Sequence, residues 1–80
     1  MTAATQNTGS FMLTKEIEIL MAERARLLRV AGAAAQFVAV MDVRKLPATV
    51  ATEADILAES VNVLSEDTLK DALAAITTPR

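Results

Sequence analysis

Three arginines, at positions 24, 26 and 29, have the residue type and spacing that could bind an anion. A guanidinium group matches phosphate and carboxylate geometry, so a cluster of three could hold an anionic small ligand. The alternative is a solvated helix face whose arginines pair with acidic residues from the second half of the chain. The acidic second half favours this alternative, and we expect no anionic ligand.

Other catalytic or metal chemistry lacks its usual residues, because histidine and cysteine are absent. Four glutamates could supply carboxylate ligands for a metal: Glu16, Glu18, Glu23 and Glu59. Di-metal bundles add histidine at Glu-x-x-His spacing, which this chain cannot provide. The serines have no histidine, no G-x-S-x-G elbow and no Ser-x-x-Lys motif around them. We therefore expect no catalytic residue, no metal and no cofactor, and predict that the chain is not an enzyme.

Charge divides the 80 residues into two halves of opposite sign. Residues 15–45 carry a net charge of +2, and residues 46–80 carry −4. Opposite signs favour a hairpin that brings the two halves together. The chain is acidic overall and has neither tryptophan nor tyrosine. Nucleic-acid binders are more often basic, with aromatic residues for stacking, so we expect no nucleic-acid partner.

The apolar spacing predicts a long first helix. Residues 1–10 are small and polar, and we interpret them as a disordered tail; residues 11–78 form the single predicted domain. From residue 11 to about Lys45 the apolar positions alternate by four and three, the heptad seam of a helix that packs on another helix. The seam comprises Leu13, Ile17, Leu20, Leu27, Ala31, Ala34, Val38 and Met41, and Arg24 alone interrupts it.

The second half contains two helix-start signals. Pro47 follows the first helix, and Thr52 is the expected N-cap of the next one. Ser65, followed by Glu66 and Asp67, is a second start signal of the same kind. The pattern is compatible with one helix broken near residue 65 or with two short helices. The predicted fold class is an all-α helical hairpin.

Residues 30–41, VAGAAAQFVAVM, contain one polar side chain, Gln36. A hairpin about residue 48 places it opposite Asn62, either as a buried amide pair or with both side chains in solvent. The same register brings Arg26 towards Asp71 and Arg29 towards Asp67.

Two faces of residues 30–41 are apolar. One contains Ala31, Ala34, Val38 and Met41, and the other contains Val30, Ala33, Phe37 and Val40. A single partner helix covers only one of them. Small residues around Gly32 would let another backbone come close.

The first predicted helix is also longer than the helical segments of the second half that could pack against it. We therefore predict that a second chain completes the core, giving a homodimer or higher oligomer such as a four-helix bundle. The predicted partner-binding residues are Leu13, Ile17, Leu20, Met21, Leu27 and Phe37. Arg24 and Gln36 are the predicted register and specificity residues. Arg24 lies on the seam, where a polar residue can fix oligomeric state, and Gln36 could set the hairpin register through its pairing with Asn62.

The resulting hypothesis is a small interaction module that regulates, adapts or inhibits a larger protein through an apolar helical face. The alternative is a structural subunit of a filament, a secretion assembly or a phage particle. The longest apolar stretch is too short to cross a bilayer, so we expect no membrane span. The opening MTAATQNTGS has neither the positive charge nor the apolar run of a secretory signal, and we expect a cytoplasmic protein.

Overall fold

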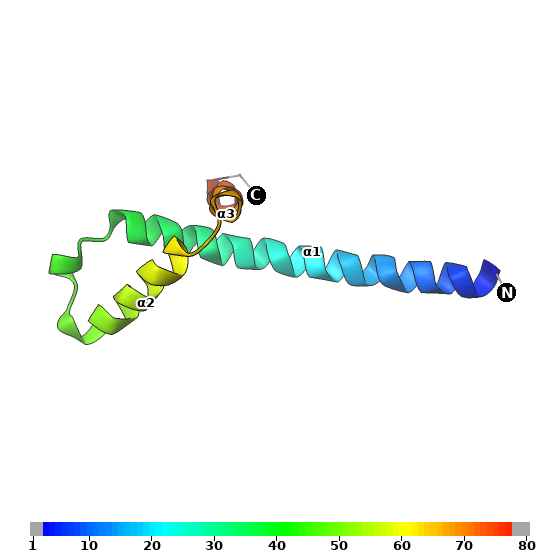
Figure 1. Ribbon diagram of the computed structural model, residues 1–80, viewed down its shortest axis with the longest axis horizontal. Helices are drawn as coiled ribbons and strands as arrows, with labels where there is room; N and C mark the ends of the chain where they lie inside the picture. Colours follow the sequence, from blue (N-terminus) through cyan, green and yellow to red (C-terminus); the bar gives the residue numbers. More distant parts are fainter. Residues whose placement is uncertain (1–2, 78–80) are drawn as a thin grey trace.

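One long helix dominates the structure (Figure 1). The structure, a computed structural model, describes residues 3–77, with side chains from residue 12 onward. Helix α1 (Ala3–Val40) is followed by two short 3-10 turns, η1 (Val43–Lys45) and η2 (Ala48–Val50). Helices α2 (Ala51–Asn62) and α3 (Glu66–Thr77) complete the order. No strand occurs between residues 3 and 77, so the all-α prediction is confirmed.

Both ends of α1 differ from the prediction. The helix begins at Ala3 rather than near residue 11, and the predicted disorder of residues 1–10 stays a prediction. It ends at Val40 rather than near Lys45, because Asp42 is extended and caps η1. The Asp42 Oδ1 accepts a hydrogen bond from the Arg44 backbone N–H at 3.0 Å. The Arg44 Nε and Nη2 also donate to this carboxylate, at 3.2 and 3.3 Å.

The predicted cap at Thr52 is wrong, because α2 begins at Ala51 with Val50 as its N-cap. The η2 turn starts directly after Pro47 and leads into α2 without a break. Its Val50 N–H donates to the Pro47 carbonyl at 3.1 Å, and the Ala51 N–H donates to the Ala48 carbonyl. These turn carbonyls satisfy N–H groups that would otherwise need a side-chain cap.

The predicted start at Ser65 is confirmed, and the second half forms two helices. The Ser65 Oγ accepts from the Thr68 backbone N–H at 3.1 Å and donates to the Thr68 Oγ1 at 2.9 Å. Glu66 and Asp67 occupy the first turn of α3, where acidic side chains interact favourably with the positive end of the helix dipole. The local capping chemistry was therefore sufficient to place this break.

Helices α2 and α3 both lie on the C-terminal half of α1. In Figure 1, α2 forms a V with α1, and α3 is seen nearly end-on where it crosses α1 steeply. We call residues 28–77 the head and residues 12–27, which extend beyond it, the arm. The molecule measures 66 × 27 × 21 Å, and its radius of gyration is 18.9 Å. A compact chain of this length would have a radius of gyration of about 12 Å.

The crossing of α1 and α3 depends on Gly32. A Cβ atom at this position would overlap the carbonyl oxygen of Ala72 and lie 3.1 Å from the Ile76 Cγ2. Ala72 is itself 0% exposed. The close approach of another backbone, predicted from the small residues around Gly32, therefore occurs within the chain.

Two arginines flank this crossing. Arg24 lies 3.5 Å from Asp71, and the Arg29 Nη1 donates to the Ala75 carbonyl at 3.2 Å. The predicted pairs Arg26–Asp71 and Arg29–Asp67 are therefore wrong. They assumed that the second half runs alongside α1, whereas α3 crosses it. Arg29 instead places a cation at the C-terminal turn of α3, which has no basic residue of its own.

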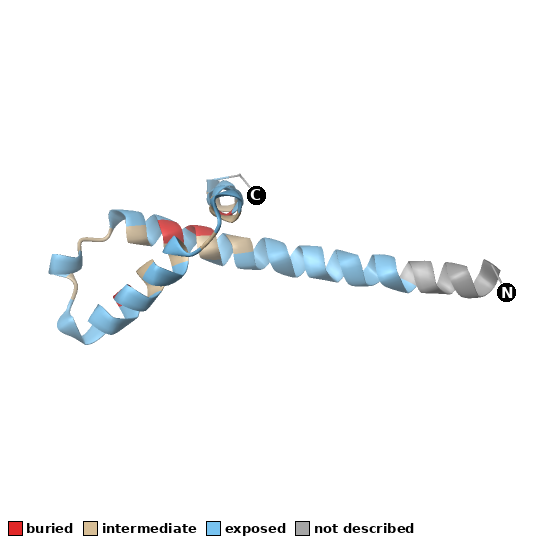
Figure 2. Ribbon diagram, viewed as in Figure 1, coloured by how far each residue is buried: buried red, intermediate tan, exposed pale blue. Residues whose placement is uncertain are grey.

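The core is small and made of small side chains. Among the described residues, the buried hydrophobic side chains are those of Ala35, Ala54 and Ala72. In Figure 2 the buried and half-buried segments lie in the head, on α1 and on the elements that face it, while the arm is exposed along its described length. Within residues 30–41, the face containing Ala31, Ala34, Val38 and Met41 is half-buried. The second apolar face stays open, with Val30, Ala33, Phe37 and Val40 exposed.

Candidate functional site

Five of the six predicted partner-binding residues lie on one side of the arm, where Arg24 interrupts them between Met21 and Leu27. At about 100° per residue, their side chains fall within a sector of about 120° around α1. We call this surface the arm face: Leu13, Ile17, Leu20, Met21 and Leu27. Their exposed fractions lie between 47% and 67%, which is large for side chains of this size on one side of a helix. The arm face is thus an apolar stripe that neither α2 nor α3 buries.

The arm face continues the seam that the head covers. Beyond Leu27 the seam positions are Ala31, Ala34 and Val38, which are half-buried against the other two helices. The same helical stripe is therefore covered in the head and open in the arm. Large contiguous apolar patches are a common feature of protein-interaction sites.

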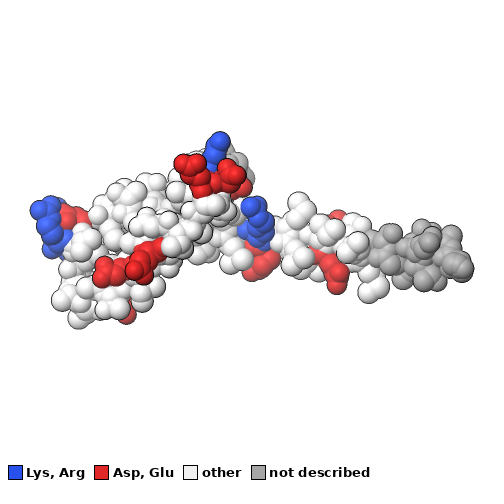
Figure 3. All heavy atoms as spheres, viewed as in Figure 1, with Lys and Arg blue, Asp and Glu red and all other residues white. Residues whose placement is uncertain are grey.

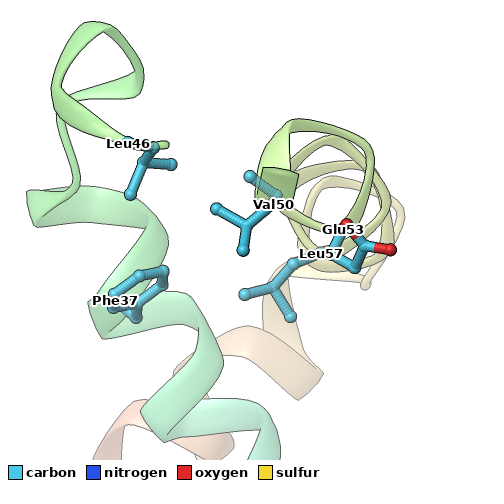
Figure 4. A pocket seen from close by; sticks show the side chains of 6 residues that line it. Phe37, Leu46, Val50, Glu53 and Leu57 are labelled. Carbon is cyan, nitrogen blue, oxygen red and sulfur yellow. The ribbon is translucent and has the colours of Figure 1, made fainter. Parts of the chain in front are cut away.

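Phe37, the sixth predicted residue, lies elsewhere. It lines an apolar pocket of about 250 Å³ between α1, the turn and α2 (Figure 4). The other lining residues are Leu46, Val50, Glu53, Ala54 and Leu57. Phe37 is 47% exposed, so the pocket is open and could accept an apolar side chain. Sequence reasoning missed the other lining residues, because which of them face Phe37 depends on the path of the turn.

The two predicted register residues have different environments. Arg24 pairs with Asp71 within its own chain, and both side chains are more than half exposed. Gln36 and Asn62 line one shallow groove of about 320 Å³, as the hairpin register predicts. Both residues are exposed, and none of the hydrogen bonds within the described residues joins them. The two amides therefore face solvent rather than form a buried pair.

The arginine cluster does not form a convergent anion site. Arg24 contacts Asp71, Arg26 contacts Glu23 at 3.3 Å, and Arg29 donates to the Ala75 carbonyl. Each guanidinium thus has its own partner. On the face shown in Figure 3, the charged side chains form small separate groups, some of mixed sign and some acidic only, with wide uncharged surface between them.

Two further features bear on the kind of site. Within residues 3–77, no three acidic side chains come together in a way that could hold a metal ion. No described helix combines the length and apolar character that crossing a membrane requires. Comparison of the chain with protein-family models, curated proteins and solved structures gives no match. The arm face and the Phe37 pocket remain as apolar surfaces that could contact another molecule.

Proposed function

We propose that this chain is a small, non-enzymatic interaction module whose arm face binds a helix of another polypeptide. The single observation that carries the proposal is the exposed apolar stripe of the arm face, whose side chains stay 47–67% exposed in the folded chain. Leu13, Ile17 and Leu20 have the i, i+4, i+7 spacing used by helices that dock into apolar surfaces. Leu27 repeats the spacing one heptad later.

Energetics support the same proposal. Fully burying one leucine or isoleucine side chain stabilises a protein by about 1.5–3 kcal/mol. The arm face contains four such side chains and one methionine, so a partner that covers part of it gains several kcal/mol. Most helical stability in proteins comes from the packing of an apolar face, so binding would also stabilise the helical arm.

The Phe37 pocket favours a second candidate, the structural subunit. It lies in the head, whereas the arm face lies on the other half of α1. If the arm of one copy occupied the pocket of the next, the contact would join two different surfaces. Contacts of that type form a ring where the rotation between copies closes and an open filament where it does not. A mass that keeps increasing with concentration would favour this candidate.

The proposed function is tested by site-specific photo-crosslinking in cells of the native source. A photoreactive residue replaces Leu20 on the arm face in one variant and Ala22 in the control. Ala22 is exposed and lies on the opposite side of the same turn. We expect a crosslinked product of defined mass from position 20 and none from position 22. Equal products from both positions, or none from either, would overturn the proposal.

A further inference from the structure

We propose that the arm face binds the arm of a second copy of this chain, with the two α1 helices antiparallel. This inference rests on the proposed function, because it names the partner of the same surface. Three properties of the structure support it: the excess surface of one copy, the position of α3, and the distribution of charge along the arm.

One copy exposes far more surface than a compact chain of its size. The accessible surface is 6530 Å² for 8.5 kDa. A compact monomer of that mass exposes about 4,700 Å². The excess is about 1,800 Å², whereas each partner in a standard protein interface loses about 800 Å². A single copy therefore has enough surplus surface for a stable dimer.

The position of α3 favours the antiparallel orientation. The contacts of α3 with α1 include Arg24, Arg29 and Gly32, so they overlap the end of the arm face at Leu27. A parallel pair would bring both heads to the same end, where each α3 lies close to the path of the other α1. An antiparallel pair separates the heads, so that each head meets only the beginning of the partner's α1. The arm faces can then overlap along their length.

Charge along the arm favours the same orientation. Lys15, Glu16 and Glu18 give the beginning of the arm a net charge of −1. The segment 23–29 contains Glu23, Arg24, Arg26 and Arg29 and has a net charge of +2. Antiparallel pairing places these segments of opposite sign next to each other, whereas parallel pairing places like charges together. Such charges contribute mainly to orientation and specificity, and the apolar contacts supply the affinity.

Two measurements on the purified chain test the proposal. Light scattering over a concentration series should give a mass that reaches a plateau at twice 8.5 kDa. The distance between copies is then measured with one spin label per chain, on the Thr49→Cys variant. Thr49 is exposed in η2 at the far end of the head, and the chain has no other cysteine.

The label distance separates the two orientations. Val40 lies about 30 Å along α1 from Leu20, at 1.5 Å per residue. In an antiparallel pair centred on the arm, the labels should therefore be about 60 Å apart or more. In a parallel pair the helix axes are about 8–10 Å apart and the heads lie side by side, so the labels would be within about 30 Å. The shorter distance would overturn the antiparallel proposal.

Matched variants connect the dimer to the arm face. Leu20→Glu should weaken self-association roughly 100-fold, because a charge replaces a central apolar contact. Ala22→Glu adds the same charge to the opposite side and should leave the mass unchanged. Leu20 is 67% exposed in a single copy, so its replacement should leave the head folded.

The remaining outcomes distinguish this inference from the proposed function. A single-copy mass at every concentration, or a mass that grows without a plateau, would overturn the closed antiparallel pair. If position 20 still crosslinks to a different protein in cells, the proposed function stands and only the second copy is excluded. If no crosslink forms either, both fail.

Discussion

The arm and the head share the continuous helix α1, but they differ in the size and exposure of the side chains along its seam. Along the arm, the seam positions are large side chains such as Leu13, Ile17 and Leu20, and they are exposed. Along the head, the seam contains Ala31 and Ala34, which are half-buried, and the adjacent Gly32 and Ala35 are buried. The distance between packed helices depends on the side chains between them. Small residues thus suit the close contacts within the chain, and large ones remain available for a partner.

The arm and the head also differ in how much space the backbone of α1 leaves for a side chain. Within a helix, glycine is about 1 kcal/mol less favourable than alanine. Gly32 is nevertheless present in α1, because the Ala72 carbonyl occupies the space that a Cβ atom would need. No such neighbour restricts the exposed Ala25 of the arm. Intrinsic helix propensity should therefore predict substitutions in the arm, and packing should predict them in the head.

The largest expected change in stability comes from replacing Gly32 by alanine. Propensity alone predicts that Gly32→Ala stabilises the protein by about 1 kcal/mol. We expect instead a loss of about 2–3 kcal/mol in the free energy of unfolding, because the added methyl group overpacks the crossing. Urea denaturation monitored by circular dichroism measures the change.

The control for this prediction is Ala25→Gly in the arm. This substitution should lower the free energy of unfolding by about 1 kcal/mol, the difference in helix propensity between alanine and glycine. A stabilising Gly32→Ala variant would show that α3 does not cross α1 as closely as described. The contrast between arm and head would then lose its main support.

An intermediate effect is expected at the start of α3, which positions Ala72 against α1. Ser65→Ala removes the acceptor of the Thr68 N–H bond and should reduce the free energy of unfolding by about 1 kcal/mol. Ser60→Ala is the matched control, because the Ser60 Oγ only donates back to the Ile56 carbonyl, at 2.7 Å. Thermal denaturation of both variants provides the measurement. Equal losses would contradict a specific role for Ser65 as a cap.

The smallest effect is expected from the ion pair at the boundary of arm and head. Arg24→Ala, Asp71→Ala and the double variant form a thermodynamic cycle for the contact at 3.5 Å. Both side chains are more than half exposed, so the coupling energy should be below about 1 kcal/mol and should decrease with added salt. A larger, salt-independent coupling would mean that the pair is buried, as it would be beneath a partner chain.

The sequence predicted the features that depend on local rules. The four-three spacing identified the long helix and its seam, and Ser65 identified the start of α3. The excess of apolar residues on two faces of residues 30–41 also predicted that one face stays uncovered. Five of the six predicted partner-binding residues share a surface, because residues on one helix keep their angular positions whatever the rest of the chain does.

Other predictions failed because they required knowledge of the path between helices. Thr52 had the local chemistry of a cap, but the η2 turn supplies the carbonyls that the first turn of α2 needs. The pairs Arg26–Asp71 and Arg29–Asp67 assumed an alongside hairpin, and a steep crossing brings different residues together. Phe37 was predicted as a partner-binding residue together with the five residues of the arm face, although the turn and α2 make it part of a separate pocket.

The sequence by itself therefore determined an all-α chain with one long helix, a break at Ser65 and more apolar surface than its second half can cover. These properties follow from periodicity, capping and the count of apolar side chains, which need no information about distant contacts. Only the tertiary structure decided where α3 crosses α1, and hence that Gly32 contacts Ala72 and that Arg24 pairs with Asp71. The crossing depends on turn geometry and on the fit of two backbones, and neither is encoded in the spacing along one helix.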